Sequence, residues 1–206
     1  MVPIPVNLIV EDQLSEAVLT KIVHFSSPSY NIGACYGKQG RSYIEKKVNN
    51  FNQAAKRTAY LVLADLNTDI CPPALITHWF NAPKHHNLLF NVAVKEVESW
   101  VLADRAGLAS FFGVSKQRIP IGVEKIDHSK EFLINLARRS RNRLIREDIV
   151  PRTGSTARIG PNYNARLAYF VENNWSIDAA CENSESLART VKRLREFTPV
   201  WETSKI

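Results

Sequence analysis

The sequence predicts an α/β fold in which a mainly parallel sheet is followed by a mainly helical C-terminal half. Short apolar runs alternate with segments of helical periodicity from residue 6 to residue 112. One of these runs, residues 59–64, is apolar throughout, as is typical of a strand buried on both faces of a parallel sheet. After Gly113 the strand-like runs stop, so the second half is expected to be helical.

The first two strand and helix pairs are marked by changes in period. Residues 6–10 form a largely apolar run that ends at Glu11, and residues 14–23 then place apolar side chains at helical spacing. A second extended segment, residues 30–36, is followed by a glycine-flanked turn and by helical spacing over residues 43–51. Each pair predicts a strand whose helix crosses back toward the next strand.

The third and fourth pairs follow the same order. Two prolines after the run at residues 59–64 allow a helix to start, with residues 74–80 as its body. The run at residues 88–94 leads into a helix that is expected to continue to about Phe112. Four pairs in succession predict a doubly wound, Rossmann-like sheet.

The second half is predicted to form a helical layer on this core. We expect an α/β core over residues 1–104 and a helical, arginine-rich extension over residues 105–206, packed together as one body, because no linker rich in Gly, Ser or Pro separates them. The expected elements of the extension are one long helix over residues 127–146, a loop over residues 154–164, and helices over residues 166–171 and 187–194.

Composition narrows the class of protein. The 206 residues are 45% hydrophobic and 23% charged, as in an ordinary globular chain. Every apolar stretch is shorter than the roughly 20 residues of a membrane span, and the N-terminus lacks the pattern of a secretory signal, so a cytoplasmic protein without a membrane partner is expected. Three separated cysteines without a C-x-x-C pair predict neither a disulfide framework nor a cysteine-rich zinc site.

The positive charge is concentrated in one segment. The chain carries a formal net charge of +7, which favours polyanionic partners, and residues 138–158 contain seven arginines against two acids. Such a run can be a solvated helix face, but the guanidinium fork also grips phosphate oxygens in pairs. The residues predicted to contact nucleic acid are Arg139, Arg143 and Arg146, on one face of the long helix, and Arg158.

Acidic side chains follow several strands of the predicted sheet. Glu11 ends the first strand, Asp65 ends the third with Asn67 and Asp69 close behind, and Glu98 follows the fourth. Ligands of open parallel sheets bind at the carboxyl ends of the strands. Taken singly, each acid could be a helix cap or a surface salt bridge, but several carboxylates at one edge repel one another unless a hard cation joins them. The pattern therefore predicts a site for Mg²⁺ or Mn²⁺.

Three segments resemble the acidic motifs of a small TOPRIM-like family that is related to OLD-type nucleases. They are Val-Glu-Asp-Gln-Leu-Ser-Glu at 10–16, Val-Leu-Ala-Asp-Leu-Asn-Thr-Asp at 62–69, and Glu-Val-Glu-Ser-Trp-Val-Leu-Ala-Asp at 96–104. The resemblance covers most of the chain and extends to Gly-Pro-Asn-Tyr at 160–163 and to residues 184–194.

The resemblance implies roles for individual residues. In TOPRIM domains a glutamate after the first strand acts as general acid or base, which implies this role for Glu11. An Asp-x-Asp pair binds Mg²⁺, and Asp65 matches its first member, while the Glu-x-Trp pattern points to Glu98 as a further ligand. Asn67 stands in place of the second aspartate, so weaker metal binding is expected, and Asp69 is an optional ligand.

Three functions are compatible with these residues. The resemblance implies an Mg²⁺- or Mn²⁺-dependent nuclease for DNA or RNA that works beside an ABC-type or AAA ATPase in defence against phage. The departure at Asn67 favours instead a catalytically weak TOPRIM-like subunit that binds nucleic acid or the ATPase without cutting. A third reading is another metal-dependent phosphotransfer enzyme on the same sheet. The sequence is compatible with an oligomer and leaves DNA and RNA undistinguished.

Other chemistry finds less support in the sequence. The segment Gly-Lys-Gln-Gly at 37–40 lacks the Walker pattern, so nucleotide hydrolysis by this chain is not expected, although Lys38 could contact a phosphate instead of lying in a plain turn. The pair His85-His86 has no further ligand at zinc-like spacing, and no G-x-S-x-G elbow predicts a serine hydrolase.

Overall fold

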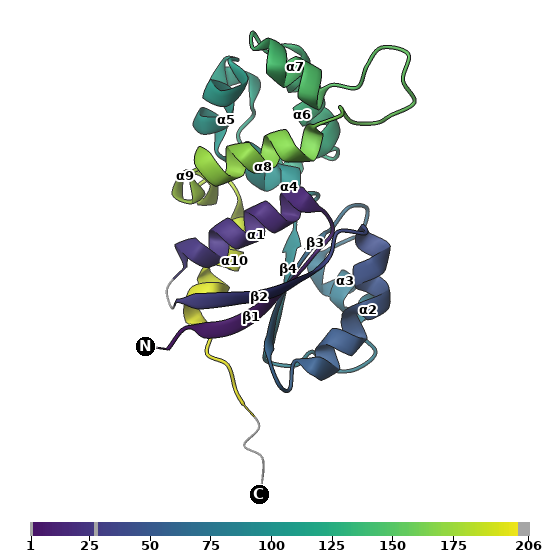
Figure 1. The fold of residues 1–206 in the computed structure, drawn as a ribbon, viewed down its shortest axis with the longest axis vertical. Helices are drawn as coiled ribbons and strands as arrows, with labels where there is room; N and C mark the ends of the chain where they lie inside the picture. The colour runs from purple at the N-terminus through teal and green to yellow at the C-terminus, as the bar shows by residue number, and fades with distance from the viewer. Residues whose placement is uncertain (1, 27–28, 202–206) are drawn as a thin grey trace, which may run out of the picture.

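A parallel sheet forms the core of the protein. The computed structural model describes residues 2–26 and 29–201. Its strands are hydrogen-bonded in the order β2-β1-β3-β4, and all pairs are parallel (Figure 1). The predicted α/β class, with a parallel sheet and a helical second half, is confirmed. The strands are β1 (Ile4–Val10), β2 (Tyr30–Gly37), β3 (Ala59–Asp65) and β4 (Leu88–Ala93).

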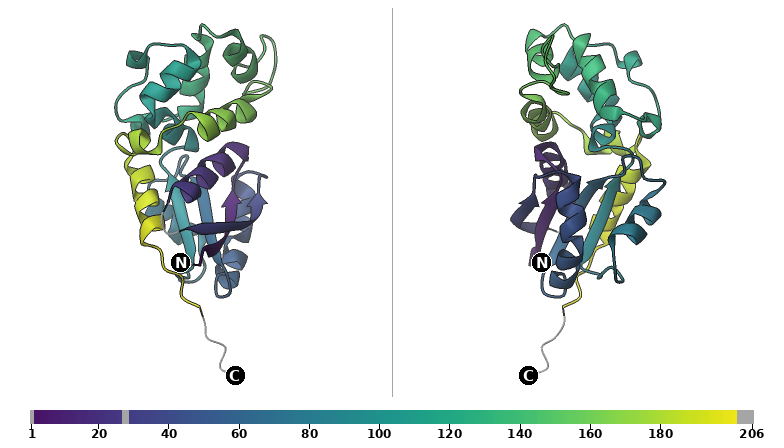
Figure 2. Two further views of the ribbon diagram at one scale, coloured as in Figure 1. Left: turned by 60° about the vertical axis from the view of Figure 1, so that its left-hand side comes forward. Right: turned by 90° about the vertical axis from the view of Figure 1, so that its right-hand side faces the viewer.

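Helices cover both faces of this sheet. Helices α1 and α10 pack on one face, and α2 and α3 pack on the other (Figure 2). None of the helices in the described ranges combines the length and apolar character that crossing a membrane requires. The helices are α1 (Gln13–Phe25), α2 (Arg41–Ala54), α3 (Pro72–Trp79), α4 (Val97–Ala103), α5 (Arg105–Phe112), α6 (Ser129–Arg138), α7 (Arg143–Ile149), α8 (Tyr163–Asn173), α9 (Ile177–Cys181) and α10 (Glu185–Glu196).

The strand sequences explain why both faces are covered. Successive side chains of a strand point to opposite faces. In β1, Leu8 and Val10 therefore join the core beneath α1, whereas Ile9 joins the core beneath α2 and α3. Every residue of β3 is buried, as its continuous apolar run predicts. Burial of a leucine-sized side chain contributes about 1.5–3 kcal/mol, so the central strands anchor the fold.

Two predicted helices are each broken into two. The prediction of one helix over residues 127–146 is wrong, because α6 ends at Arg138 and α7 begins at Arg143. Ser140 is buried at the break, where its Oγ accepts the Asn142 N–H at 2.9 Å, and the Asn142 side chain then caps α7. The helix expected to run to Phe112 is divided in the same way at Asp104, whose carboxylate caps α5.

The helical half lies over the carboxyl ends of the strands. Helix α8 packs along α1, and the segment between α7 and α8, residues 150–162, projects from this layer as a long loop (Figure 1). Helix α10, although part of the predicted extension, returns to the sheet and packs on β4. The extension therefore contacts the core in two places, through α8 on α1 and through α10 on β4. Its loop belongs to the part of the extension that lies over the carboxyl ends of the strands.

Candidate functional site at the carboxyl edge of the sheet

Glu11 and Asp65 meet at the point of the sheet where the connecting helices change from one face to the other. Strands β1 and β3 are neighbours, and their following helices α1 and α3 lie on opposite faces of the sheet. Such a switch point opens a crevice at the carboxyl ends of the strands. Across it, the Asp65 backbone N–H donates to Glu11 Oε1 at 3.0 Å, and the Val97 N–H donates to Asp65 Oδ1 at 2.8 Å.

Local sequence fixes the position of Glu11. Asp12 caps α1 by accepting the Ser15 N–H at 2.8 Å, so β1 ends and the helix begins directly around Glu11. Gly37 has a φ of +107°, and a Cβ at this position would lie 2.0 Å from the Val10 carbonyl oxygen. Only glycine allows this approach, which brings the end of β2 against the end of β1 beside Glu11.

Glu98 lies deeper, beneath the edge of the sheet. Its side chain is fully buried in the first turn of α4. The Tyr163 hydroxyl donates to Glu98 Oε1 at 2.9 Å, and Lys130 Nζ lies 3.4 Å from the same oxygen. The other oxygen, Oε2, is buried without a hydrogen-bond partner in the part of the chain that the structure describes. Glu96 is only half-buried, and its Oε2 accepts the Lys130 backbone N–H at 2.7 Å.

Burial and mutual repulsion make these carboxylates unusually basic. Burial, together with the charges of Glu11 and Glu98, raises the pKa of Asp65 well above its ordinary value. Burial also raises the pKa of Glu11 and of Glu98. Burial alone would lower the pKa of Lys130, but the surrounding carboxylates, Glu98 first, raise it overall. The negative charge of the three carboxylates therefore exceeds the positive charge of Lys130. A cation bound at this edge would lower the pKa values of the carboxylates.

The carboxylate oxygens at this edge are suited to bind a hard cation, although three acids do not converge on one position. Within residues 2–26 and 29–201, no three His, Cys, Asp or Glu side chains are arranged to hold one metal ion. Mg²⁺, however, commonly uses only one or two carboxylates and keeps several waters. Glu11 and Asp65 form such a pair, each with one oxygen bound to backbone. The predicted ligand role of Glu98 stays a prediction, and its orphaned Oε2 is the feature that fits it.

The two remaining predicted ligands lie just beyond Asp65. Asn67 is half-buried with a φ of +51°, and its backbone N–H donates to the Lys95 carbonyl at 2.7 Å. Asp69 forms an ion pair with Arg41, which also donates to the Asp65 carbonyl oxygen at 2.8 Å. The carboxylate of Asp69 thus holds Arg41 against the site. The sequence did not predict a role for Arg41, because its position at the start of α2 carries no motif.

Asn67→Asp should tighten binding of a divalent cation if the side chain reaches the ion. A carboxylate is a better ligand for a hard dication than an amide oxygen, so we expect the dissociation constant for Mn²⁺ to fall by roughly tenfold. Calorimetric titration of both proteins measures the change. Unchanged affinity would place Asn67 outside the coordination shell and remove its correspondence to a second motif aspartate.

A basic cleft lies beside the network around Glu98. This cleft, between α6 and the loop at residues 150–158, has a volume of about 760 Å³. Glu96 and Lys130 are among its lining residues, and Lys130 Nζ lies 3.4 Å from Glu98 Oε1, so the cleft adjoins the network around Glu98. Its basic lining residues are Arg138, Arg152, Arg158, His128 and Lys130.

Of the arginines predicted to contact nucleic acid, only Arg158 lines this cleft. The prediction that Arg139, Arg143 and Arg146 share one helix face is wrong, because the chain turns between α6 and α7. Arg143 is paired with Glu147 at 2.6 Å, and Arg146 donates to the Ser140 carbonyl at 2.5 Å. The helical spacing of these arginines could not reveal the break between α6 and α7. The break depends on the buried Ser140.

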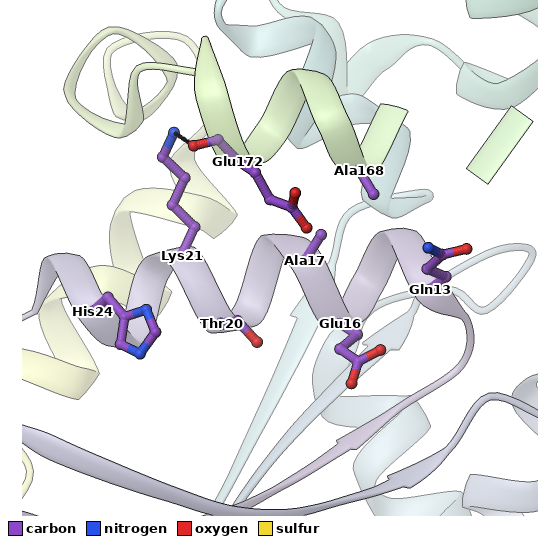
Figure 3. Close-up of a pocket in the computed structure, with 8 residues that line it drawn as sticks. All are labelled: Gln13, Glu16, Ala17, Thr20, Lys21, His24, Ala168 and Glu172. Atoms are coloured by element: carbon purple, nitrogen blue, oxygen red, sulfur yellow. Dashed lines mark hydrogen bonds between the residues drawn. The ribbon is translucent and has the colours of Figure 1, made fainter. Parts of the chain in front are cut away.

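Lys38 lies beside Glu11 in the backbone, because its N–H donates to the Val10 carbonyl at 3.0 Å, but its side chain pairs with a different acid. Lys38 has a φ of +60° and forms an ion pair with Glu16 at 2.8 Å. A cavity of about 540 Å³ lies between α1 and α8 (Figure 3). Lys21 crosses it, and its Nζ donates to the Val171 carbonyl at 2.6 Å. No predicted catalytic residue lines this cavity, whose lining is Gln13, Glu16, Ala17, Thr20, Lys21, His24, Ala168 and Glu172.

The fold and the site together define a parallel α/β protein with an acidic switch-point site and a basic cleft beside it. Comparison with protein-family models, with curated proteins and with solved structures found no match.

Proposed function

We propose that this chain is a divalent-metal-dependent enzyme that cleaves phosphodiester bonds in nucleic acid. The observation that carries the proposal is the Glu11–Asp65 pair at the switch point, together with a nearby cleft that is lined by three arginines and by Lys130. A carboxylate edge alone would repel a polyanion. Guanidinium groups beside it would hold backbone phosphates while the carboxylates face the bond to be broken.

The residues divide into binding and proton-handling groups. Glu11 and Asp65 would hold Mg²⁺ or Mn²⁺ together with water molecules, and the bound ion would polarise the phosphate and make a water more acidic. The resemblance of the acidic motifs assigns Glu11 the role of general acid or base, so it would accept a proton from that water. Arg138, Arg152 and Arg158 would fix the phosphates on either side of the reacting one.

Cleavage of labelled nucleic acid tests this proposal directly. The protein is incubated with labelled DNA and labelled RNA, single- and double-stranded, in Mg²⁺ or Mn²⁺ and in a chelator. We expect cutting of at least one substrate that depends on the metal and that Glu11→Gln reduces by about 10²-fold or more. Cutting that Glu11→Gln leaves unchanged would exclude the site as the source of the activity.

A binding subunit without catalysis is the second candidate. Two observations favour it: Asn67 offers a neutral oxygen near the acids, and Glu98 is already engaged with Tyr163 and Lys130. Under this candidate the protein binds the labelled nucleic acid, but the cleavage assay shows no cutting. A partner ATPase and a role in phage defence belong to the proposal in either form, and they rest on the resemblance of the acidic motifs.

The basic cleft should dominate the salt dependence of nucleic-acid binding. Replacing Arg138, Arg152 and Arg158 together by Ala should weaken binding to any sequence. For duplex DNA, each lost phosphate contact lowers the slope of log K against log salt by about 0.9, so the slope should become shallower by roughly 2 to 3. Binding measured by fluorescence anisotropy over a range of salt concentrations gives this slope.

A matched triple variant controls for the loss of net charge. Arg139, Arg141 and Arg143 are exposed, come from the same segment and do not line the cleft. Replacing these three by Ala removes the same charge and should change the slope by less than half as much. Equal effects of the two triple variants would show that the cleft has no special part in binding.

A further inference from the structure

Strand β4 forms one edge of the sheet, where α3 lies on one face and α10 lies on the other. It pairs with β3 along one edge, and the sheet order leaves its other edge without a neighbouring strand (Figure 2). An unpaired strand edge presents a row of backbone donors and acceptors, which is a template for another strand. The site at the carboxyl ends of the strands does not use this edge.

The hydrogen bonds to β3 show which backbone groups point outward. In a parallel strand, the N–H and C=O of one residue point to the same side, and successive residues alternate. The carbonyls of Asn87 and Ala93 accept N–H groups of β3 and its extension, both at 2.9 Å. The backbone groups of Leu88, Phe90 and Val92 therefore point away from β3.

Part of the outer edge is covered by the protein itself. Lys84 Nζ donates to the Leu88 carbonyl at 2.9 Å, and Arg193 reaches the Phe90 carbonyl at a longer 3.4 Å. Among the described residues, none hydrogen-bonds to the Phe90 N–H or to the N–H and C=O of Val92. Phe90 and Val92 are only 2% and 7% exposed, so these groups lie in a recess where a bonding partner would be favourable.

A narrow groove runs along this part of the strand. It has a volume of about 180 Å³ and is floored by Phe90 and Val92. Pro72 and Ile76 of the α3 region form one wall. Polar and basic residues of α10, among them Arg189 and Arg193, form the other wall. The two walls therefore differ in chemistry, one apolar and one basic.

We propose that this groove binds an extended peptide segment of a partner protein, which adds a fifth strand to the sheet at β4. The side chains of an added strand alternate between the two faces of the sheet. One set would contact Pro72 and Ile76, and the other set would contact Arg189 and Arg193. The segment that fits is therefore one in which apolar and acidic residues alternate.

Other occupants fit this edge less well. A second copy of the chain, paired edge to edge, would bring Arg189 and Arg193 against their own counterparts, and this like-charge contact is unfavourable. The chain's own residues near the end of the described range cover only the beginning of β4. There Val200 and the Asn87 side chain exchange two hydrogen bonds, at 2.8 and 2.9 Å, and neither bond reaches the outward backbone groups of Phe90 and Val92.

Binding of designed peptides tests the groove. The probe is a short fluorescein-labelled peptide in which valine and glutamate alternate, and its counterpart alternates valine and lysine. We expect the glutamate peptide to bind about tenfold or more tightly than the lysine peptide, because acidic side chains would meet the basic wall. Hydrogen exchange of the Phe90 and Val92 amides should slow in the presence of the glutamate peptide, because both amides would become hydrogen-bonded.

Two protein variants locate the binding. Val92→Pro removes an outward N–H but no hydrogen bond to β3, so the sheet should survive while peptide affinity falls by about tenfold. Arg189→Glu should weaken the glutamate peptide and strengthen the lysine peptide. Lys192→Glu is the matched control, since Lys192 lies on the same helix outside the groove, and it should leave both affinities within about twofold.

The proposal is overturned by any of three results of the peptide-binding measurements. They are no binding of the glutamate peptide up to millimolar concentration, equal binding of both peptides, and binding that folded Val92→Pro and Arg189→Glu retain at wild-type strength. A dimer of the protein alone that Val92→Pro disperses in sedimentation would also overturn it, because the edge would then belong to a second copy. None of these outcomes depends on nuclease activity.

Discussion

Asp65→Asn is expected to abolish cleavage of nucleic acid while it raises the melting temperature of the metal-free protein near pH 7. Loss of activity, by about 10²-fold or more, follows from removal of a carboxylate that would hold the cation. Gain of stability follows because burial and the neighbouring carboxylates make the charged form of Asp65 unfavourable in the folded protein. Asparagine keeps an oxygen that can accept the Val97 N–H, so the local backbone should be preserved.

The sign of the pH effect follows from the raised pKa of Asp65. The folded protein binds this proton more tightly than the unfolded chain does, so the wild-type protein loses stability as pH rises from about 4 through the raised pKa. Each pKa unit corresponds to about 1.4 kcal/mol, and 1 kcal/mol shifts the melting temperature of a chain of this size by roughly 2 to 4 °C. Asp65→Asn should therefore melt higher than wild type at pH 7 and should show a flatter pH profile.

Asp127→Asn is the matched control for this variant. It makes the same chemical change at an exposed carboxylate whose pKa is lowered by its hydrogen bond and ion pair with Lys95. Its melting temperature at pH 7 should be equal to that of wild type or slightly lower. Thermal melts between pH 4 and 8 measure all three proteins. If Asp65→Asn melted below wild type at pH 7, the repulsion at this edge would be refuted.

Lys130→Met is expected to cause the largest loss of stability among the site variants. Lys130 is the cation that faces the buried Glu98, and its removal would leave that carboxylate without its ion-pair partner. Breaking a fully buried pair costs about 3–5 kcal/mol, and less is expected here because the Lys130 side chain is 38% exposed. A fall of the melting temperature on the order of 5 °C is expected.

A second substitution at Glu98 should reverse most of this loss. Glu98→Gln removes the charge but retains an oxygen that accepts the Tyr163 hydroxyl. The double variant Lys130→Met with Glu98→Gln should therefore be more stable than Lys130→Met alone, with a coupling of at least about 1 kcal/mol. Denaturant unfolding of the four proteins gives this coupling. Additive effects would show that Lys130 does not stabilise the Glu98 charge.

The sheet and its acidic edge could be predicted because both depend on local patterns. A continuous apolar run such as residues 59–64 is typical of strands buried on two faces, and β3 occupies it with one further residue. Parallel strands place their carboxyl ends at one edge, so Glu11 and Asp65 were expected at the same edge once the strands were assigned. Neither inference required knowledge of tertiary contacts.

The basic cleft and the buried network could not be predicted, because they depend on contacts between distant segments. Tyr163 reaches Glu98 across 65 positions of the chain, and no periodicity links them. The break between α6 and α7 depends on Ser140 being buried, and it redirects the arginines that a continuous helix would have aligned. Arg152 reaches the cleft only because the loop after α7 folds back toward α6.

Calorimetric titration of Mn²⁺ into the protein and into Asp65→Asn is the most direct test of the site at the carboxyl edge. We expect wild-type protein to bind Mn²⁺ at a saturable site and to release protons to the buffer as it does so, because the ion would displace them from the carboxylates with raised pKa values. Asp65→Asn should bind at least about tenfold more weakly and release fewer protons. Equal binding by the two proteins, or no binding by wild type, would contradict the assignment of this edge as a metal site.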